Sequence, residues 1–293
     1  MVLKEKLRGT GVAIITPFNE KEEVDFNALE KVINFNIENG VEYIVSLGTT
    51  GETPTLEKSE KIDIIHFTTE KVNNRVPIVV GVGGNNTKEV IKDLEILPLN
   101  NAIAVLSASP YYNKPSQEGL YMHYKLLSES SSKPIILYNV PGRTGRNLNA
   151  STTIQLSHEC KNIVGIKEAS GDLAQCMQII KDCQKDFLVV SGDDHLAMPQ
   201  IACGMQGVIS VAANCFPKDF SNMVRAALSN DFNTARELQY KMLEGYDILF
   251  AENNPAGVKA FLFEMGLIEN KFRLPVTKLS LPQHQRVVKF LNK

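Results

Sequence analysis

Short runs of apolar, mostly β-branched residues recur eight times between residues 11 and 214, with room for a helix after each run. Within a run the apolar residues are nearly continuous, which is typical of strands buried on both faces, as in a parallel sheet. The pattern therefore predicts eight parallel strands. Their expected ranges are 11–18, 42–48, 77–83, 102–109, 134–140, 163–170, 187–194 and 207–214.

The segments between these runs have the spacing of amphipathic helices. In residues 25–39, for example, apolar side chains recur every three or four positions. Gly40 follows, where a left-handed residue often ends a helix. Eight strand–helix units in succession favour a closed α/β barrel, the (β/α)8 TIM barrel, over a doubly wound sheet. We expect a catalytic barrel domain over residues 1–223 and a helical C-terminal domain over residues 224–293, where the strand pattern stops.

The composition favours a globular protein that acts on small molecules. Of the 293 residues 43% are hydrophobic, which is enough for a full core. The formal net charge is -2 with both signs interspersed, so no basic stripe is available for nucleic acid. No apolar run reaches the roughly 20 residues needed to span a membrane. The first residues lack the pattern of a secretory signal, and the five cysteines contain no Cys-x-x-Cys pair, so we expect a cytoplasmic protein with reduced thiols.

Polar residues follow most of the predicted strands at their carboxyl ends. Tyr138 and Asn139 end the fifth run, and Lys167 and Glu168 end the sixth. In a parallel barrel these ends lie on one face, where active sites of this fold are built. The sequence therefore predicts a pocket at the mouth of the barrel.

Lys167 lies in a segment that otherwise has the pattern of a buried strand. Burial disfavours an ammonium ion, and the neutral amine is the nucleophile that attacks a carbonyl to form an imine. A lysine that extends to solvent or pairs with Glu168 explains the same pattern. Tyr138 could transfer protons beside this amine, or it could be a core aromatic whose hydroxyl reaches the surface.

Other candidate residues lie in loops. The Gly-Thr-Thr-Gly-Glu turn at 48–52 offers hydroxyls and backbone amides that suit a carboxylate. Arg143 could hold a second carboxylate or remain solvated. The five histidines are scattered, and neither they nor the Asp193-Asp194-His195 cluster has the pattern of a metal site. The phosphate-binding loop and the complete dinucleotide fingerprint are both absent.

Several motifs occur in order along the chain: GTTGE (48–52), SPYYNKPSQEGLY (109–121), YNVPGRTG (138–145), GIKEASGD (165–172) and SGDD (191–194). Together they closely resemble the dihydrodipicolinate synthase (4-hydroxy-tetrahydrodipicolinate synthase) family. The resemblance extends from Gly9 through NPAGVKAFL (254–262) to RLPVTKLS (273–280), which is nearly the whole chain.

The resemblance implies a role for each matching position. Lys167 would form the Schiff base with pyruvate, and Tyr138 would transfer protons. Thr49 and Tyr112 would join Tyr138 in a proton relay, with Tyr112 completing the site of the neighbouring subunit. The implied substrate-binding residues are Thr50 for the pyruvate carboxylate, Arg143 for the carboxylate of the second substrate, and Gly192 and Ile209 through their main-chain groups.

The implied reaction condenses pyruvate with L-aspartate 4-semialdehyde, the committed step toward diaminopimelate and lysine. The catalytic lysine supplies the electron sink, so the resemblance implies no metal and no organic cofactor. A tyrosine shared between subunits requires at least a dimer, and the family is commonly a homotetramer built as a dimer of dimers.

Family members that respond to lysine bind it in a separate pocket. Lys58 and Lys61 stand where sensitive enzymes have histidines, and added positive charge disfavours a cationic ligand. We therefore predict that lysine inhibits weakly or not at all. The matching positions of that allosteric pocket are Thr53, Pro54, Lys58, Lys61, Asn85, Glu89 and Tyr111.

Other functions stay open from the sequence. An N-acetylneuraminate lyase or keto-deoxy-sugar-acid aldolase of the same superfamily shares the lysine and the tyrosine, although the 48–52 turn and Arg143 favour the synthase. A barrel that has lost catalysis and serves as a binding module is a possibility from another class, and the intact relay opposes it. A nicotinamide- or phosphate-dependent barrel enzyme has no motif in its favour.

Overall fold

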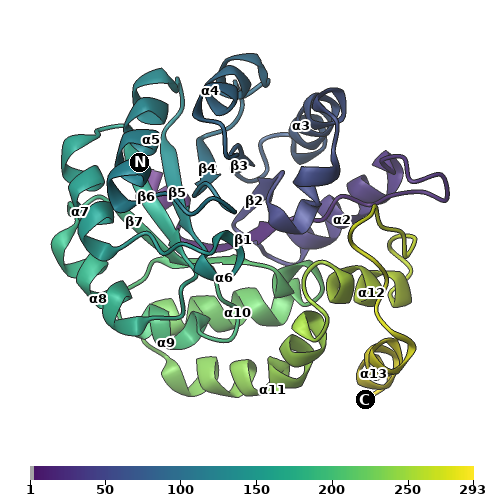
Figure 1. Cartoon of the computed structure of the whole chain (residues 1–293). Coiled ribbons are helices and arrows are strands. Elements are labelled where there is room, and N and C mark those ends of the chain that lie inside the picture. Colours follow the sequence, from purple (N-terminus) through teal and green to yellow (C-terminus); the bar gives the residue numbers. More distant parts are fainter. Residues whose placement is uncertain (1–2) are drawn as a thin grey trace.

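The computed structural model describes residues 3–293, and its strands close into a single barrel (Figure 1). Every strand is parallel to its neighbours, and β1 pairs with β8 to complete the ring. The predicted (β/α)8 barrel is therefore confirmed. The strands are β1 (Gly9–Ala13), β2 (Tyr43–Ser46), β3 (Ile78–Gly81), β4 (Ala104–Ala108), β5 (Ile135–Asn139), β6 (Ile163–Glu168), β7 (Leu188–Ser191) and β8 (Gly207–Ser210).

Helices surround the strands, and three more follow the barrel (Figure 1). None of the helices within residues 3–293 is both long and apolar enough to cross a membrane. The helices are α1 (Leu3–Lys6), α2 (Phe26–Glu38), α3 (Lys58–Val72), α4 (Thr87–Ile96), α5 (Gln117–Ser130), α6 (Pro141–Thr144), α7 (Ala150–Glu159), α8 (Leu173–Asp182), α9 (Ala197–Ala202), α10 (Pro217–Leu228), α11 (Phe232–Phe250), α12 (Ala256–Glu264) and α13 (Leu281–Leu291). Short 3-10 turns are η1 (Thr49–Gly51), η2 (Thr53–Thr55) and η3 (Ala212–Asn214).

Helix α2 forms as its spacing predicts. The side chain of Asp25 caps it by accepting a hydrogen bond from the Ala28 amide at 2.9 Å. Its apolar face is buried against the barrel, and Gly40 follows with φ 92°, a conformation that glycine adopts without strain. Local sequence and tertiary packing therefore agree in this segment.

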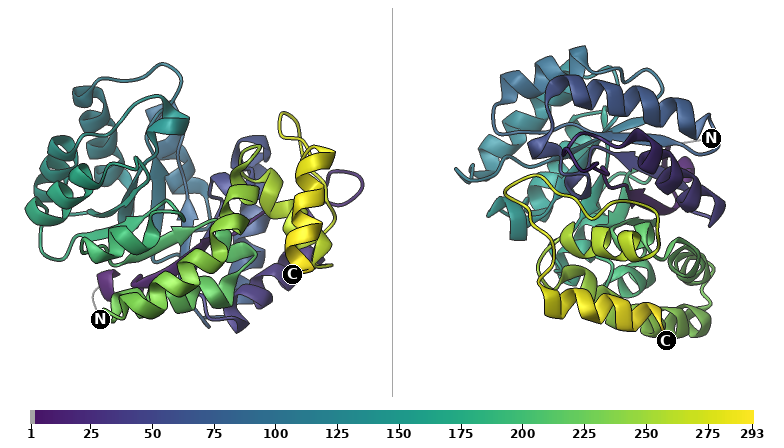
Figure 2. Two further views of the ribbon diagram at one scale, coloured as in Figure 1. Left: turned by 90° about the horizontal axis from the view of Figure 1, so that it is seen from below. Right: turned by 90° about the vertical axis from the view of Figure 1, so that its right-hand side faces the viewer.

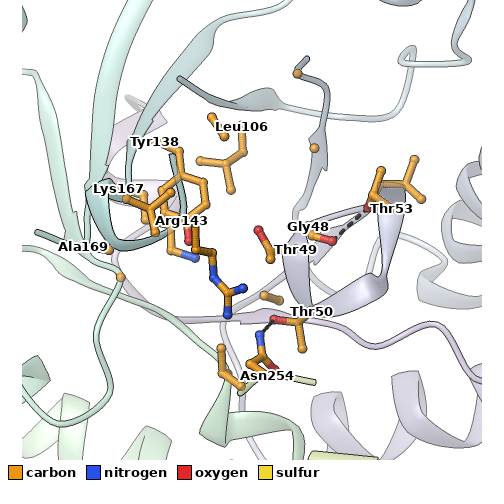
Figure 3. A pocket seen from close by; sticks show the side chains of 18 of the residues that line it. Gly48, Thr49, Thr50, Thr53, Leu106, Tyr138, Arg143, Lys167, Ala169 and Asn254 are labelled. Carbon is orange, nitrogen blue, oxygen red and sulfur yellow. Dashed lines mark hydrogen bonds between the residues drawn. The ribbon is translucent and has the colours of Figure 1, made fainter. Parts of the chain in front are cut away.

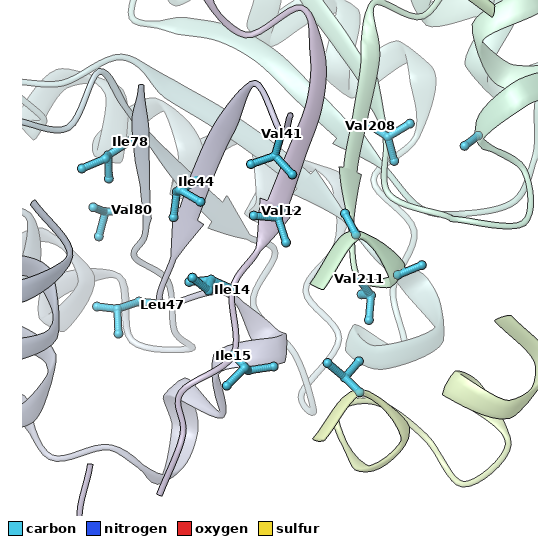
Figure 4. Packing of buried hydrophobic residues seen from close by; sticks show 14 of the residues in the cluster. Val12, Ile14, Ile15, Val41, Ile44, Leu47, Ile78, Val80, Val208 and Val211 are labelled. Carbon is cyan, nitrogen blue, oxygen red and sulfur yellow. The ribbon is translucent and has the colours of Figure 1, made fainter. Parts of the chain in front are cut away.

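The strands are buried on both faces, which explains their continuous apolar runs. Tyr43, Val45 and Val79 belong to a cluster inside the barrel. Their neighbours Ile44 and Val80 point outward into a larger cluster between the strands and the helices (Figure 4). Because side chains alternate along a strand, both faces need apolar residues.

All eight strands are shorter than the sequence predicts, and the difference at the carboxyl end is largest for β1 and β8. β1 ends at Ala13 rather than near residue 18, and β8 ends at Ser210 rather than at residue 214. The side chain of Asn214 replaces the missing strand pairing, since it accepts from the Ile15 amide at 3.2 Å and donates to the Ala13 carbonyl at 2.9 Å. An apolar run continues past both strand ends because the segments beyond remain buried.

The region after β8 packs along one side of the barrel, where α11, α12 and α13 contact one another (Figure 2). Helix α10 packs on β1 and β8, so it covers the barrel as its eighth helix. Residue 223, the expected domain boundary, lies inside α10. We propose that a division into two domains belongs in the turn at 229–231, between α10 and α11.

Candidate active site

A cavity of about 740 Å³ opens at the carboxyl ends of the strands (Figure 3). Side chains from β4, β5 and β6 line it, together with the connections that follow β2, β3 and β7. Its size suits a small organic ligand. The predicted pocket at the mouth of the barrel is present.

Lys167 lies in this cavity beside Tyr138. The two residues face each other in the register of β5 and β6, and the Lys167 Nζ is 4.3 Å from the centroid of the Tyr138 ring. Lys167 is 4% exposed and Tyr138 is 7% exposed. The amine and the aromatic ring are thus in contact within one enclosed space, and both residues line the cavity.

Glu168, the neighbouring carboxylate, does not pair with Lys167. It accepts hydrogen bonds from the side-chain amide of Asn139 at 3.0 and 3.1 Å and from that of Gln175 at 3.1 Å. The Ser170 amide donates a further bond at 2.7 Å. The interpretation of Lys167 as the ion-pair partner of Glu168 is therefore wrong, and so is the interpretation of a lysine that extends to solvent.

Gly192 provides the space that the Lys167 side chain occupies. A Cβ atom at residue 192 would lie 2.8 Å from the Lys167 Cε and 2.7 Å from the Ala169 Cβ. Gly192 also lines the cavity, as expected. Ile209 is fully buried inside the barrel next to Gly11 on β1, and within residues 3–293 it is not among the residues that line the cavity.

The turn that carries Thr49 and Thr50 is fixed by hydrogen bonds at both ends. Thr16 donates to the Gly51 carbonyl at 2.7 Å, and Thr53 donates to the Gly48 carbonyl at 2.9 Å. Both threonines of η1 line the cavity. Their hydroxyls therefore have a defined place opposite Lys167 and Tyr138 (Figure 3).

Arg143 enters the cavity from α6, the short helix after β5. Its guanidinium projects into the cavity that Thr50 also lines (Figure 3) and donates a hydrogen bond to the Asn253 Oδ1 at 3.0 Å. The Asn254 side chain in turn donates to the Thr50 Oγ1 at 3.0 Å. Two site residues are thus held by the segment between α11 and α12.

Sequence reasoning missed this contribution of the C-terminal region. Asn254 and Phe250 line the cavity, and Asn253 holds Arg143. The motif at 254–262 was a signal for a role near the site, because it lies outside the expected barrel and yet matches the family.

Tyr112 is separate from the other predicted catalytic residues of its own chain. It is 89% exposed, has φ 68° and, within residues 3–293, is not among the residues that line the cavity. The adjacent Tyr111 does line the cavity, and its amide donates to the Asn85 Oδ1 at 2.7 Å. The loop thus presents Tyr112 outward, where a bulky side chain with positive φ is unusual.

Four of the seven expected allosteric residues lie on the wall of the same cavity, and within residues 3–293 the other three are not among the residues that line it. Thr53, Pro54, Lys61 and Tyr111 line it. Lys58 forms an ion pair with Asp93 at 2.8 Å, and Glu89 forms one with Lys92 at 2.9 Å. Lys61 therefore brings positive charge to the cavity wall, while the charge of Lys58 is directed to Asp93.

The acidic pair after β7 has a structural role at Asp194. Burial raises the pKa of its carboxyl, which accepts hydrogen bonds from the amides of Val211 and Ala212. These contacts join the end of β7 to the turn after β8. Within the part of the chain that the structure describes, no group of three or more His, Cys, Asp or Glu side chains could hold a metal ion.

Known proteins are similar to this chain in fold and in sequence over almost its whole length. The model of the dihydrodipicolinate synthetase family matches residues 6–293. A 4-hydroxy-tetrahydrodipicolinate synthase from Phocaeicola vulgatus is 47% identical over 99% of this chain and 98% of that protein. The crystal structure of dihydrodipicolinate synthase from Thermotoga maritima has a TM-score of 0.95 at 39% identity, covering 98% of both chains. The chloride-inhibited enzyme from Acinetobacter baumannii, crystallised with pyruvate, has a TM-score of 0.94 at 42% identity, also covering 98% of both chains.

Proposed function

Since this chain belongs to the dihydrodipicolinate synthetase family, we propose which of its residues carry out the reaction of that family. The chain is a lyase with 4-hydroxy-tetrahydrodipicolinate synthase activity, in the biosynthesis of diaminopimelate and lysine. Its substrates are pyruvate and L-aspartate 4-semialdehyde. The observation that carries the assignment of the catalytic lysine is the enclosed amine of Lys167 beside the phenol of Tyr138.

The reaction begins at Lys167. Its neutral amine attacks the keto carbon of pyruvate and forms a carbinolamine, and loss of water then gives the imine. The hydroxyl needs a proton to leave as water, and Tyr138 is the nearby group that can supply it. The hydroxyl of Thr50 and its neighbouring backbone amides hold the pyruvate carboxylate, in a turn whose two ends are tied down.

The imine activates the methyl group of pyruvate. Loss of a methyl proton gives an enamine, with the imine nitrogen as the electron sink. Tyr138, joined to Thr49 and to Tyr112 of a neighbouring copy, passes this proton toward solvent. No metal ion and no organic cofactor takes part in these steps.

The second substrate enters from the side of Arg143. The guanidinium binds its carboxylate, and Asn253 holds the guanidinium at 3.0 Å. The enamine carbon attacks the aldehyde carbon and forms the new carbon–carbon bond. The amine of the second substrate then displaces Lys167 from the imine, which closes the ring and frees the enzyme.

The proposed assembly is a homotetramer, a dimer of dimers. Tyr112 is 89% exposed in its own chain, so it is available to a partner's cavity. We also propose a cytoplasmic location, because the cysteine usage is typical of a reducing compartment. Binding of nucleic acid or of a membrane forms no part of the proposal.

The nearest other function is that of a sugar-acid aldolase or N-acetylneuraminate lyase. The identity of 47% to named synthases, over nearly the whole chain, favours the synthase. Coupled assays with L-aspartate 4-semialdehyde and with N-acetylneuraminate separate the two functions.

Borohydride trapping tests the proposed chemistry. The protein is incubated with pyruvate and sodium borohydride, which reduces an imine to a stable secondary amine, and the modified residue is mapped by mass spectrometry. An adduct of pyruvate mass on Lys167 alone is expected. A folded protein without an adduct would contradict the mechanism and favour a binding module.

A further inference from the structure

A second buried lysine, Lys259, lies outside the cavity and takes no part in the mechanism above. It belongs to α12, is fully buried and forms an ion pair with Glu52, whose side chain is 1% exposed. Its Nζ also donates to the Lys271 carbonyl at 2.9 Å and lies 4.2 Å from the centroid of the Phe18 ring. The surroundings of this amine are therefore almost completely dry.

A buried ion pair of this kind contributes little net free energy to folding. Burial lowers the pKa of the Lys259 amine to about 8, against the opposing effect of Glu52. Desolvation of two charges cancels much of their attraction, and apolar residues of similar volume often stabilise a core at least as well. A buried pair of this kind is better explained by the geometry that it imposes.

The ion pair lies at the end of the turn that carries Thr49 and Thr50, because Glu52 is the residue that follows this turn. Glu52 is the last residue of GTTGE and follows η1, and its amide donates to the Thr49 carbonyl at 3.1 Å. Its backbone has φ 52°, a left-handed conformation that is unfavourable for a residue with a side chain. Residues in such conformations persist where their surroundings hold them, often at functional sites.

Arg273 strengthens the attachment from the other side. Its amide donates to the Glu52 carboxylate at 3.4 Å, and its guanidinium binds both oxygens of Glu60 at 2.6 and 2.7 Å. Residues 259–273 therefore fasten the chain on both sides of η2.

The same C-terminal region touches the site at three points. Asn253 holds Arg143, Asn254 holds Thr50, and Lys259 holds Glu52. These three contacts start from one short segment, residues 253–259, and reach two different site loops.

We infer that Lys259 and Glu52 are positioning residues for the known reaction: their pair holds the turn at 49–52 so that Thr49 and Thr50 face the bound pyruvate. The inference rests on the proposed role of Thr50 as the residue that holds the pyruvate carboxylate. It assigns to the C-terminal region a part in substrate binding as well as in packing.

The test compares Glu52→Gln and Lys259→Met with Lys271→Met. Lys271 pairs with Glu20 at the surface at 2.5 Å, and its backbone carbonyl survives the change, so it is a matched control. We expect kcat/KM for pyruvate to fall about 10- to 100-fold in Glu52→Gln and Lys259→Met, mainly through KM, because small displacements at a site have effects of this size. Saturating pyruvate with borohydride still labels Lys167 in both variants, and Lys271→Met behaves as the wild type does.

Two results would overturn the inference. The first is a KM for pyruvate within about twofold of the wild-type value in variants that fold. The second is a fall in kcat alone that equals the fall in the fraction of Lys167 labelled by borohydride. That second result would mean that the substitution only reduces the amount of folded enzyme, as expected for a merely structural role. Glu52→Gln keeps the shape of its side chain, so it carries the test if Lys259→Met does not fold. A wild-type protein that gives no adduct on Lys167 refutes the proposed function instead, and so the two failures are distinguishable.

Discussion

Tyr138 and Lys167 occupy paired positions on neighbouring strands, with the lysine Nζ 4.3 Å from the centre of the tyrosine ring. Because both residues lie on strands of a closed barrel, their relative position depends on the sheet register and is independent of any mobile loop. Replacing Tyr138 with Phe keeps the ring and removes only the hydroxyl group, which carries the proton. We expect kcat of Tyr138→Phe to fall about 10²- to 10⁴-fold, the usual contribution of a general acid or base.

Borohydride trapping of the pyruvate adduct distinguishes the role of Lys167 from that of Tyr138. Lys167→Ala should give no borohydride adduct at all, whereas Tyr138→Phe should give the adduct slowly but completely. A Tyr138→Phe enzyme with the wild-type rate would remove Tyr138 from the proton relay.

Mixing two inactive variants tests whether Tyr112 serves a partner. In a hybrid dimer of Lys167→Ala and Tyr112→Phe, one of the two sites combines an intact lysine with an intact tyrosine. Random exchange of subunits should restore about a quarter of the wild-type activity, because half of the dimers are hybrids with one good site each. Mass spectrometry of the mixture confirms that exchange has occurred. Exchange without recovery would show that each chain uses its own tyrosine.

Replacing Asn253 should weaken the binding of L-aspartate 4-semialdehyde and leave the binding of pyruvate unchanged. Asn253→Gly removes the side chain that holds Arg143 and tolerates the local φ of 76°. Loss of a hydrogen bond to a charged group should raise KM for L-aspartate 4-semialdehyde about tenfold. Steady-state kinetics with each substrate varied in turn measures this, and an equal change in KM for pyruvate would contradict the assignment of Arg143.

Inhibition by lysine should be weak or absent. Lys61 lines the cavity, so a cationic amino acid would meet a positive charge there. Initial rates at rising L-lysine concentration test this prediction, with sodium chloride at equal ionic strength as the control. An inhibition constant in the low-millimolar range or below would contradict it.

His123 should make stability depend on pH. Burial lowers the pKa of its imidazole to about 4, whereas an unfolded histidine titrates near 6.5. Between these values the unfolded state binds a proton that the native state does not, so the free energy of unfolding falls as the pH decreases. His123→Asn keeps a hydrogen-bond partner for Thr87, which lies 2.9 Å from the His123 Nδ1. Urea unfolding at several pH values between about 4 and 7 should show a smaller decline for the variant, and equal slopes would refute the assignment.

The barrel could be predicted from the sequence because its signal is local. Each strand is an apolar run a few residues long, and the polar residues that follow mark the carboxyl ends. Lys167 and Tyr138 stood out as polar groups at the ends of such runs. The predicted carboxyl ends of β1 and β8 were wrong because the residues that follow each strand stay buried although they no longer pair with a neighbouring strand. Apolar residues indicate burial and do not indicate strand pairing.

The C-terminal contacts had no such local signal. The hydrogen-bonded side chains of Asn254 and Thr50 are 204 residues apart in the sequence. The sequence around either residue has no periodic pattern that predicts this contact. Lys259 was visible as a charge within the apolar residues of α12, but its partner Glu52 is known only from the folded structure. Long-range pairs of polar side chains depend on the complete fold.

This same separation of 204 residues has a consequence for synthesis. A ribosome adds about 5–20 residues per second, so the turn with Thr50 is made roughly 10–40 s before Asn254 exists. A growing chain can assemble its early strands during that interval while its pyruvate pocket stays unfinished. Catalytic competence should therefore begin only after α12 has been translated, because residues 253–259 hold Arg143, Thr50 and Glu52.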